Sequence, residues 1–236
     1  MAGLFSPRGA KPPSGGPLVN APRVIIYFLL VFVGVHVIGA VVDETAQAWI
    51  RFNFSLTPLF IVNATGIGAD MLWLPPWLTL LTYAFLHADI THVVLNSLWF
   101  LVFGTVVARR VGGLRLSGLF AVSALVGGLV HVACHWDAIQ PVIGASAAVA
   151  GLMGAAFRFI LVGGFDADRR VQLLPLTSRP ILIATLIWLA FNVVSGVTGF
   201  SPSGFGMSIA WEAHLGGYFA GLVLFPFFDR GLRVIK

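Results

Sequence analysis

Charged residues are scarce in this chain. Only 10% of its 236 residues are Asp, Glu, Lys or Arg, whereas 58% are hydrophobic, and the mean hydropathy is +0.94. A soluble domain carries about 25% charged residues, so most of the surface of this protein must face something other than water. The single cysteine, Cys134, excludes an intramolecular disulfide. This composition predicts an all-α membrane protein.

Long apolar runs take up most of the chain. Each is close to the ~20 residues that cross ~30 Å of hydrocarbon as a helix. Residues 1–22 hold five prolines and several glycines, a composition that cannot build a core, and they are predicted to form a flexible cytoplasmic tail. Residues 23–236 are predicted to form one membrane domain of six transmembrane helices. The six runs are 24–42, 92–108, 116–133, 144–163, 180–198 and 208–228.

Lys and Arg residues are distributed unevenly between the two predicted sides of the membrane. With the N-terminus inside, only Arg51 falls in an outer segment, and the other thirteen lie at the inner ends of the runs. This asymmetry predicts a protein of the cell membrane with both termini in the cytoplasm. The basic residues border apolar runs, so the predicted partner is the lipid bilayer with its anionic headgroups, and not nucleic acid. The long segment 43–79 between the first two runs predicts an interfacial loop with short helices.

Four polar side chains are predicted to share one depth in the membrane. Counted from the charged inner ends at 1.5 Å per residue, His92, Asn96, Ser146 and His214 lie about 18–26 Å up. Polar side chains within spanning helices are expensive and are functional hypotheses by default. His92 and Asn96 are four residues apart and share a helix face. Three different runs can therefore bring these groups together.

Ser146 and His214 have the chemistry of a nucleophile and its base. Ser146 lies near a helix start, where unpaired N–H groups suit a developing oxyanion. Small residues dominate 144–154 and 213–221, which favours close helix contact. Each feature also has an ordinary explanation: a helix N-cap, a packed histidine, and simple helix packing. His36 lies at a similar depth and stays open as an alternative base.

At these positions the sequence resembles the rhomboid family of intramembrane serine proteases. His87, His92 and Asn96 match its H-x4-H-x3-N motif on the second helix. The G-x-S-x4-G-x-x-G motif of the fourth helix is matched by Gly144, Ser146, Gly151 and Gly154, and the A-H-x-x-G-x-x-x-G motif of the sixth by Ala213, His214, Gly217 and Gly221.

The resemblance implies a Ser–His dyad with Ser146 as nucleophile and His214 as general base. It also implies that the oxyanion is held by the backbone N–H of Ser146 and by the side chains of His92 and Asn96, and that no cofactor is needed. Substrates would be single-pass membrane proteins cut near the outer end of their helix. Three features depart from the family pattern. Ala150 stands where many members have a tyrosine that stacks on the histidine, and Ala108 where an acid often precedes Arg110. The Trp-Arg pair that is usual in the outer loop is not evident near Trp77.

The residues also allow three other interpretations. A catalytically inactive rhomboid-like protein that binds membrane clients is the main alternative, although such relatives usually lose one dyad residue. A transporter would be expected to show inverted repeats or interrupted helices. His131, Cys134, His135 and Asp137 have metal-ligand chemistry, but no other span was seen to supply a matching cluster, so no metal site is predicted. Glu212 is two residues from His214 and is expected to face elsewhere.

Overall fold

The computed structural model describes residues 20–63, 69–164, 172–201, 204–205 and 210–229, and within these ranges it is almost entirely helical. Most of the predicted tail and Arg169 and Arg170 lie outside the described residues. The long helices are α1 (Arg23–Val41), α5 (Ile90–Trp99) with α6 (Thr105–Val111), α7 (Gly113–Cys134), α8 (Ser146–Gly163), α9 (Arg179–Thr198) and α10 (Trp211–Phe228). Shorter elements are α2 (Glu44–Phe54), α3 (Pro58–Val62), α4 (Thr79–Thr82), the 3₁₀ turns η1 (Ala69–Met71), η2 (Pro76–Leu78) and η3 (Tyr83–Phe85), and the paired strands β1 (Phe200–Ser201) and β2 (Gly204–Phe205).

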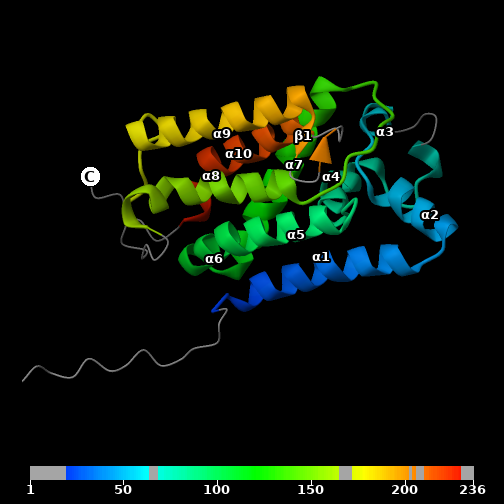
Figure 1. Cartoon of the computed structure of the whole chain (residues 1–236), viewed down its shortest axis with the longest axis horizontal. Coiled ribbons are helices and arrows are strands. Elements are labelled where there is room, and N and C mark those ends of the chain that lie inside the picture. The colour runs from blue at the N-terminus through cyan, green and yellow to red at the C-terminus, as the bar shows by residue number, and fades with distance from the viewer. Residues whose placement is uncertain (1–19, 64–68, 165–171, 202–203, 206–209, 230–236) are drawn as a thin grey trace, which may run out of the picture.

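The long helices run side by side and form a bundle (Figure 1). α1 and α9 lie at opposite edges, while α10 packs between α7, α8 and α9. The short helices α2, α3 and α4 gather at one end of the bundle (Figure 1). The predicted loop 43–79 therefore does contain short helices, and its place at the membrane interface stays a prediction.

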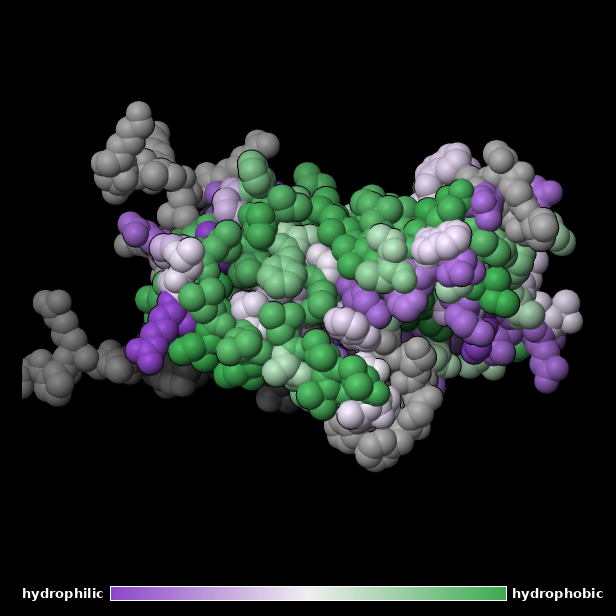
Figure 2. Space-filling view, turned by 90° about the horizontal axis from the view of Figure 1, so that it is seen from above, coloured by the Kyte–Doolittle hydropathy of each residue, from purple (hydrophilic) through white to green (hydrophobic). Residues whose placement is uncertain are grey.

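Among the described residues, four helical segments are long and apolar enough to cross a membrane: Arg23–Val41, Ile90–Val111, Gly113–Cys134 and Arg179–Thr198. α8 is apolar but slightly short, with Ser146–Val162 as its apolar stretch. Hydrophobic residues cover the middle of the face seen in Figure 2, and hydrophilic residues gather toward its ends. The outer helices α1 and α9 expose large apolar side chains such as Leu30 and Leu186, as expected where the solvent is lipid. The number of six spans stays a prediction.

The predicted run 92–108 is one continuous helical segment with a change of pitch. α5 passes into a π-helical turn, η4 (Phe100–Gly104), and then into α6. Asp89 caps the start of α5, since its Oδ1 accepts the backbone N–H of His92 at 2.8 Å. A π turn inside an α-helix often marks a functional site, and this one lies one turn after Asn96.

A buried ion pair joins the end of α6 to the end of α10. The Nε and Nη2 atoms of Arg110 donate to Oδ2 of Asp229 at 2.9 and 2.8 Å. The guanidinium also lies over the ring of Phe159 on α8, 4.6 Å from its centroid. The acid that pairs with Arg110 is therefore Asp229, 119 positions along the chain, and not a residue at position 108, where the family pattern has an acid and this chain has Ala108.

Candidate active site

The loop before α8 presents Ser146 at the first helical position. Leu56 and Val142 exchange two backbone hydrogen bonds, of 3.0 and 2.8 Å, and the N–H of Gly144 donates to the carbonyl of Tyr83 at 2.9 Å. Gly144 has φ +125°, a conformation that L side chains rarely adopt. α8 then begins at Ser146, where the first N–H groups of a helix have no intrahelical partner.

Ser146 and His214 are in hydrogen-bond contact although 68 residues separate them. Oγ of Ser146 lies 2.8 Å from Nε2 of His214, which stands in the first turn of α10. Gly127 of α7 makes this approach possible. A Cβ on Gly127 would lie 2.6 Å from the carbonyl oxygen of Ala213 and 2.8 Å from the Cβ of Ala147, the chain neighbours of the two site residues. Three helices thus meet at one glycine beside the pair.

Asn192 of α9 holds the other ring nitrogen of His214. Its Oδ1 lies 3.0 Å from Nδ1 of His214, while its Nδ2 donates to the carbonyl of Trp188 at 3.0 Å. A carbonyl can only accept, so the amide orientation is fixed and Oδ1 must accept from Nδ1–H. Nε2 of His214 then carries the lone pair that faces the Ser146 hydroxyl. Asn192 is buried, and no motif in the sequence marks it as a site residue.

His92 lies on the other side of Ser146. The backbone N–H of Ala88 donates to Nδ1 of His92 at 3.3 Å, which leaves the proton of the neutral ring on Nε2. That Nε2 atom borders Gly144, because a Cβ added there would lie 2.7 Å from it and 3.8 Å from Oγ of Ser146. Asn96 is buried one turn further along α5, where its Nδ2 donates to the carbonyl of His92 at 3.0 Å. His92 therefore directs an N–H donor toward the segment that carries the serine.

Known proteins match this chain over most of its length. The sequence model of the Rhomboid domain matches residues 75–230. The chain is 29% identical over 203 residues to the rhomboid protease GlpG of Salmonella choleraesuis (strain SC-B67), and 28% identical to those of Salmonella newport (strain SL254) and Salmonella typhimurium (strain LT2). These alignments cover 85% of this chain and 60% of each relative. The chain belongs to the rhomboid family.

As a rhomboid with several apolar helices, it is a multi-pass membrane protein. It spans less than two thirds of the length of the relatives it matches, so their protease activity is not transferred to it by the alignment alone. What the fold adds is the arrangement around Ser146, in which α8, α9 and α10 each contribute one polar side chain to a continuous chain of hydrogen bonds.

In this rhomboid, His87 lies outside the helix to which its motif assigned it. It precedes the Asp89 cap of α5 and is buried, with its ring edge-on to that of His92 at 5.2 Å between centroids. Burial is the main cause that lowers the pKa of His87 to about 3, so this ring is neutral. His87 and His36 line a cavity of about 130 Å³ between α1 and the segment before α5. The partner of the Ser146 hydroxyl is His214, and His36 lies in this separate cavity.

The motif glycines lie where α8 and α10 touch. A Cβ on Gly217 would collide with the carbonyl of Ala147, and one on Gly221 with the carbonyl of Gly151. Gly151 and Gly154 are equally crowded, by Ser123 and by the backbone of Tyr218. Only glycine permits this separation between the two helices that carry Ser146 and His214.

The space beside Ala150, where many rhomboids have a tyrosine, is filled from α10. Tyr218 is fully buried in a cluster with Ala150, Ile181 and Leu222, and its ring stacks on Trp188 of α9 with centroids 4.2 Å apart. Its hydroxyl lies 2.7 Å from Oγ1 of Thr185. The aromatic ring therefore comes from the helix of His214 itself, one turn below it. The contact that orients His214 is the hydrogen bond that its Nδ1–H donates to Oδ1 of Asn192.

Proposed function

We propose that this rhomboid is an intramembrane serine endopeptidase that uses Ser146 as nucleophile and His214 as general base. The 2.8 Å separation of Oγ and Nε2 is the observation that carries the proposal, because a base must lie within about 2.6–3.2 Å of the proton it removes. Retention of both side chains, in contact, disfavours the inactive alternative.

The reaction would follow the steps of serine proteases. Nε2 of His214 takes the proton of Ser146 as Oγ attacks the scissile carbonyl, and then gives it to the leaving amine. A water molecule, activated by the same nitrogen, releases the acyl group. Asn192 would keep the ring in the tautomer that this cycle needs, since it accepts from Nδ1–H and stabilises the imidazolium.

The oxyanion would be held by the backbone N–H of Ser146 and by Nε2–H of His92, with Asn96 as a further donor. Two observations support these roles. Ser146 opens α8, whose free N–H groups and positive dipole end favour a developing negative charge. The bond from Ala88 to Nδ1 of His92 keeps the donor proton on the nitrogen next to Gly144.

The substrates would be single-pass membrane proteins, cut near the outer end of their transmembrane helix. A substrate helix would approach from the lipid past α9. This helix is a peripheral element with a largely exposed surface, and Phe191 and Leu186 face outward. Trp188, by contrast, packs on Tyr218. A peptide that reaches Ser146 would have to displace the Trp188 side chain or go around it.

The test uses purified full-length protein in detergent with a model transmembrane substrate. Cleavage is expected for the native chain and is expected to be lost in Ser146→Ala and His214→Ala. The matched controls are Ser117→Ala, whose hydroxyl only bonds the carbonyl of Gly113, and His36→Ala. A fluorophosphonate probe should add its mass to the Ser146 peptide alone. Cleavage that persists in Ser146→Ala, or that depends on His36 and not on His214, would refute the assignment.

A further inference from the structure

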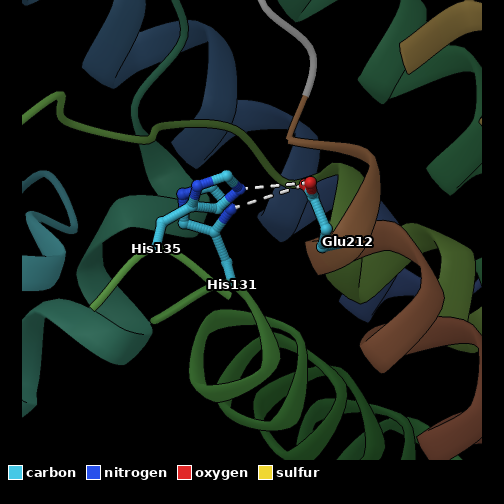
Figure 3. Close-up of side chains that lie close together, drawn as sticks. All are labelled: His131, His135 and Glu212. Carbon is cyan, nitrogen blue, oxygen red and sulfur yellow. Dashed lines mark hydrogen bonds and ion pairs between the residues drawn. The ribbon is translucent and has the colours of Figure 1, made fainter. Parts of the chain in front are cut away.

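A second polar cluster lies at the junction of α7 and α10, on side chains that the proposed protease chemistry does not use. His131 is in the last turn of α7, His135 follows it as the C-cap residue, and Glu212 is in the first turn of α10. Figure 3 shows both imidazole rings directed at the carboxylate. Cys134 and Asp137, which the sequence places beside these histidines, do not belong to this group. The third potential ligand, Glu212, comes from α10 and is distant in sequence from the two histidines.

The geometry of the three side chains is close to that of a metal site. One nitrogen or oxygen from each residue lies within 4.8 Å of the others. Nε2 of His135 is 3.1 Å from Oε1 of Glu212, and Nδ1 of His131 is 3.8 Å from Oε2. Ligand atoms of a tetrahedral zinc ion, at about 2.0–2.2 Å from the metal, lie about 3.3–3.5 Å apart. The two observed separations, each to a different oxygen of the Glu212 carboxylate, lie on either side of this value.

This cluster differs from an ordinary ion pair because Nδ1 of His131 is buried without a hydrogen-bond partner. The His131 side chain is nine-tenths buried, and its Nδ1 has no hydrogen-bond partner. Its distance to Glu212, 3.8 Å, is too long for a hydrogen bond. Buried polar atoms are nearly always paired, so this nitrogen requires an explanation. A cation placed between the rings and the carboxylate would satisfy it, and the half-exposed side chain of His135 gives that cation a route from water.

We propose that His131, His135 and Glu212 bind one divalent transition-metal ion of the zinc class. Two imidazoles and a carboxylate match the preferences of Zn²⁺, and the i, i+4 spacing of the histidines places both on one face of the helix end. With three protein ligands, the ion keeps a fourth position for water. Bound there, it ties the end of α7 to the start of α10, two residues before His214.

The experiment measures metal content. Untagged full-length protein in detergent is stripped with a chelator, incubated with Zn²⁺, separated from free ion, and analysed by mass spectrometry for zinc. The expected result is one Zn²⁺ per chain, with an apparent melting temperature higher than that of the stripped protein. Glu212→Gln, His131→Ala and His135→Ala are expected to bind at least ~100-fold more weakly, because even loss of an outer-shell partner costs about 10–100-fold.

Controls separate this site from other ligands and from the protease proposal. Cys134→Ser and His36→Ala are expected to retain zinc, and so is Ser146→Ala, because metal binding does not depend on the nucleophile. His135→Ala keeps the test decisive if His131→Ala misfolds, since the His135 side chain is 42% exposed. Native protein that binds no zinc, or zinc binding that survives both His135→Ala and Glu212→Gln, would overturn the proposal.

Discussion

At the scale of single residues, the side chain of Asn192 decides which nitrogen of His214 faces Ser146. Its amide donates to the Trp188 carbonyl and accepts from Nδ1–H, so Nε2 is left with its lone pair toward the hydroxyl. The arrangement Ser–His–Asn is chemically analogous to the Cys–His–Asn sites of papain-like proteases. The hydrogen bond to Asn192 explains how the His214 ring is oriented in a chain that has Ala150 in place of the usual tyrosine.

Replacement of Asn192 by alanine is expected to lower kcat by about 10–100-fold with little change in KM. A hydrogen bond to a charged group contributes about 1.5–3 kcal/mol, and this bond strengthens when His214 becomes an imidazolium in the transition state. Asn192→Asp should retain part of the activity, because a carboxylate also accepts from Nδ1–H but cannot donate to the Trp188 carbonyl. Steady-state cleavage assays on both variants give the split between kcat and KM.

Ser195→Ala is the matched control for Asn192→Ala, since Ser195 is also a buried polar residue on α9. It should leave both constants unchanged. An Asn192→Ala enzyme with native kcat would remove Asn192 from the site.

Residue spacing made Ser146, His214, His92 and Asn96 candidates, since polar groups in apolar runs are costly and these four share a depth. It left His36 open as the base, and the roles of the four residues came from the family resemblance. Residue spacing could not single out Asn192. One asparagine in the run 180–198 has no partner at a helical spacing, and its role arises only from the rotation of α9 about its axis. The contact of Glu212 with His135 was not predictable without the packing of α7 against α10.

At the scale of helices, the contact between α8 and α10 depends on glycine more than on side-chain interlocking. Gly151 and Gly154 of α8 face Gly217, Tyr218 and Gly221 of α10 with their backbones in contact. Ser146 and His214 each lie at the beginning of one of these helices. A change in their separation is therefore passed directly to the distance between Oγ and Nε2.

Gly221→Ala is expected to lower both stability and activity. The new Cβ would overlap the carbonyl of Gly151, a backbone atom that can move only with its helix. Such overpacking costs about 1–3 kcal/mol, and a shift of about 1 Å at a catalytic pair can cost about 100-fold in rate. Thermal unfolding in detergent and the cleavage assay measure the two effects.

Gly34→Ala on α1 is the control for this change, because a Cβ there meets nothing within 4 Å. It should leave activity unchanged and, through the better helix propensity of alanine, leave stability equal or higher by up to about 1 kcal/mol. Equal behaviour of the two variants would mean that the close approach of α8 and α10 is not needed.

Helix positions followed well from the sequence because apolar runs of about 20 residues have few other solutions. The exceptions arise from local backbone geometry. The π turn Phe100–Gly104 has no signal in hydropathy, and the start of α5 after His87 depends on the Asp89 cap. The pair between Arg110 and Asp229 joins residues 119 positions apart, and only the return of α10 beside α6 brings them together.

At the scale of the whole molecule, apolar surface surrounds a polar centre. α1 and α9 expose Leu30, Val37, Leu186 and Val197, among others, while the hydrogen-bonded side chains of Ser146 and His214 are partly buried between helices. Such an apolar surface requires a lipid or detergent environment, and the distribution of Lys and Arg predicts how the protein is oriented in the membrane. Both Ser146 and His214 stand at helix starts that the Lys and Arg distribution assigns to the outer side.

Six spans with an inner N-terminus require an inner C-terminus, which reporter fusions can test. α8 has 18 residues and is about 27 Å long at 1.5 Å per residue, close to the ~30 Å of the hydrocarbon core. A green fluorescent protein fused to the C-terminus should therefore fluoresce in a bacterial host. Alkaline phosphatase fused there should be inactive, because its disulfides form only outside the cytoplasm. The same two reporters fused after Ala138, in the loop between α7 and α8, should behave in the opposite way.

Active phosphatase at the C-terminus would mean an odd number of spans, with either α8 or α10 not crossing the membrane. The starts of α8 and α10 would then lie at different levels from those proposed.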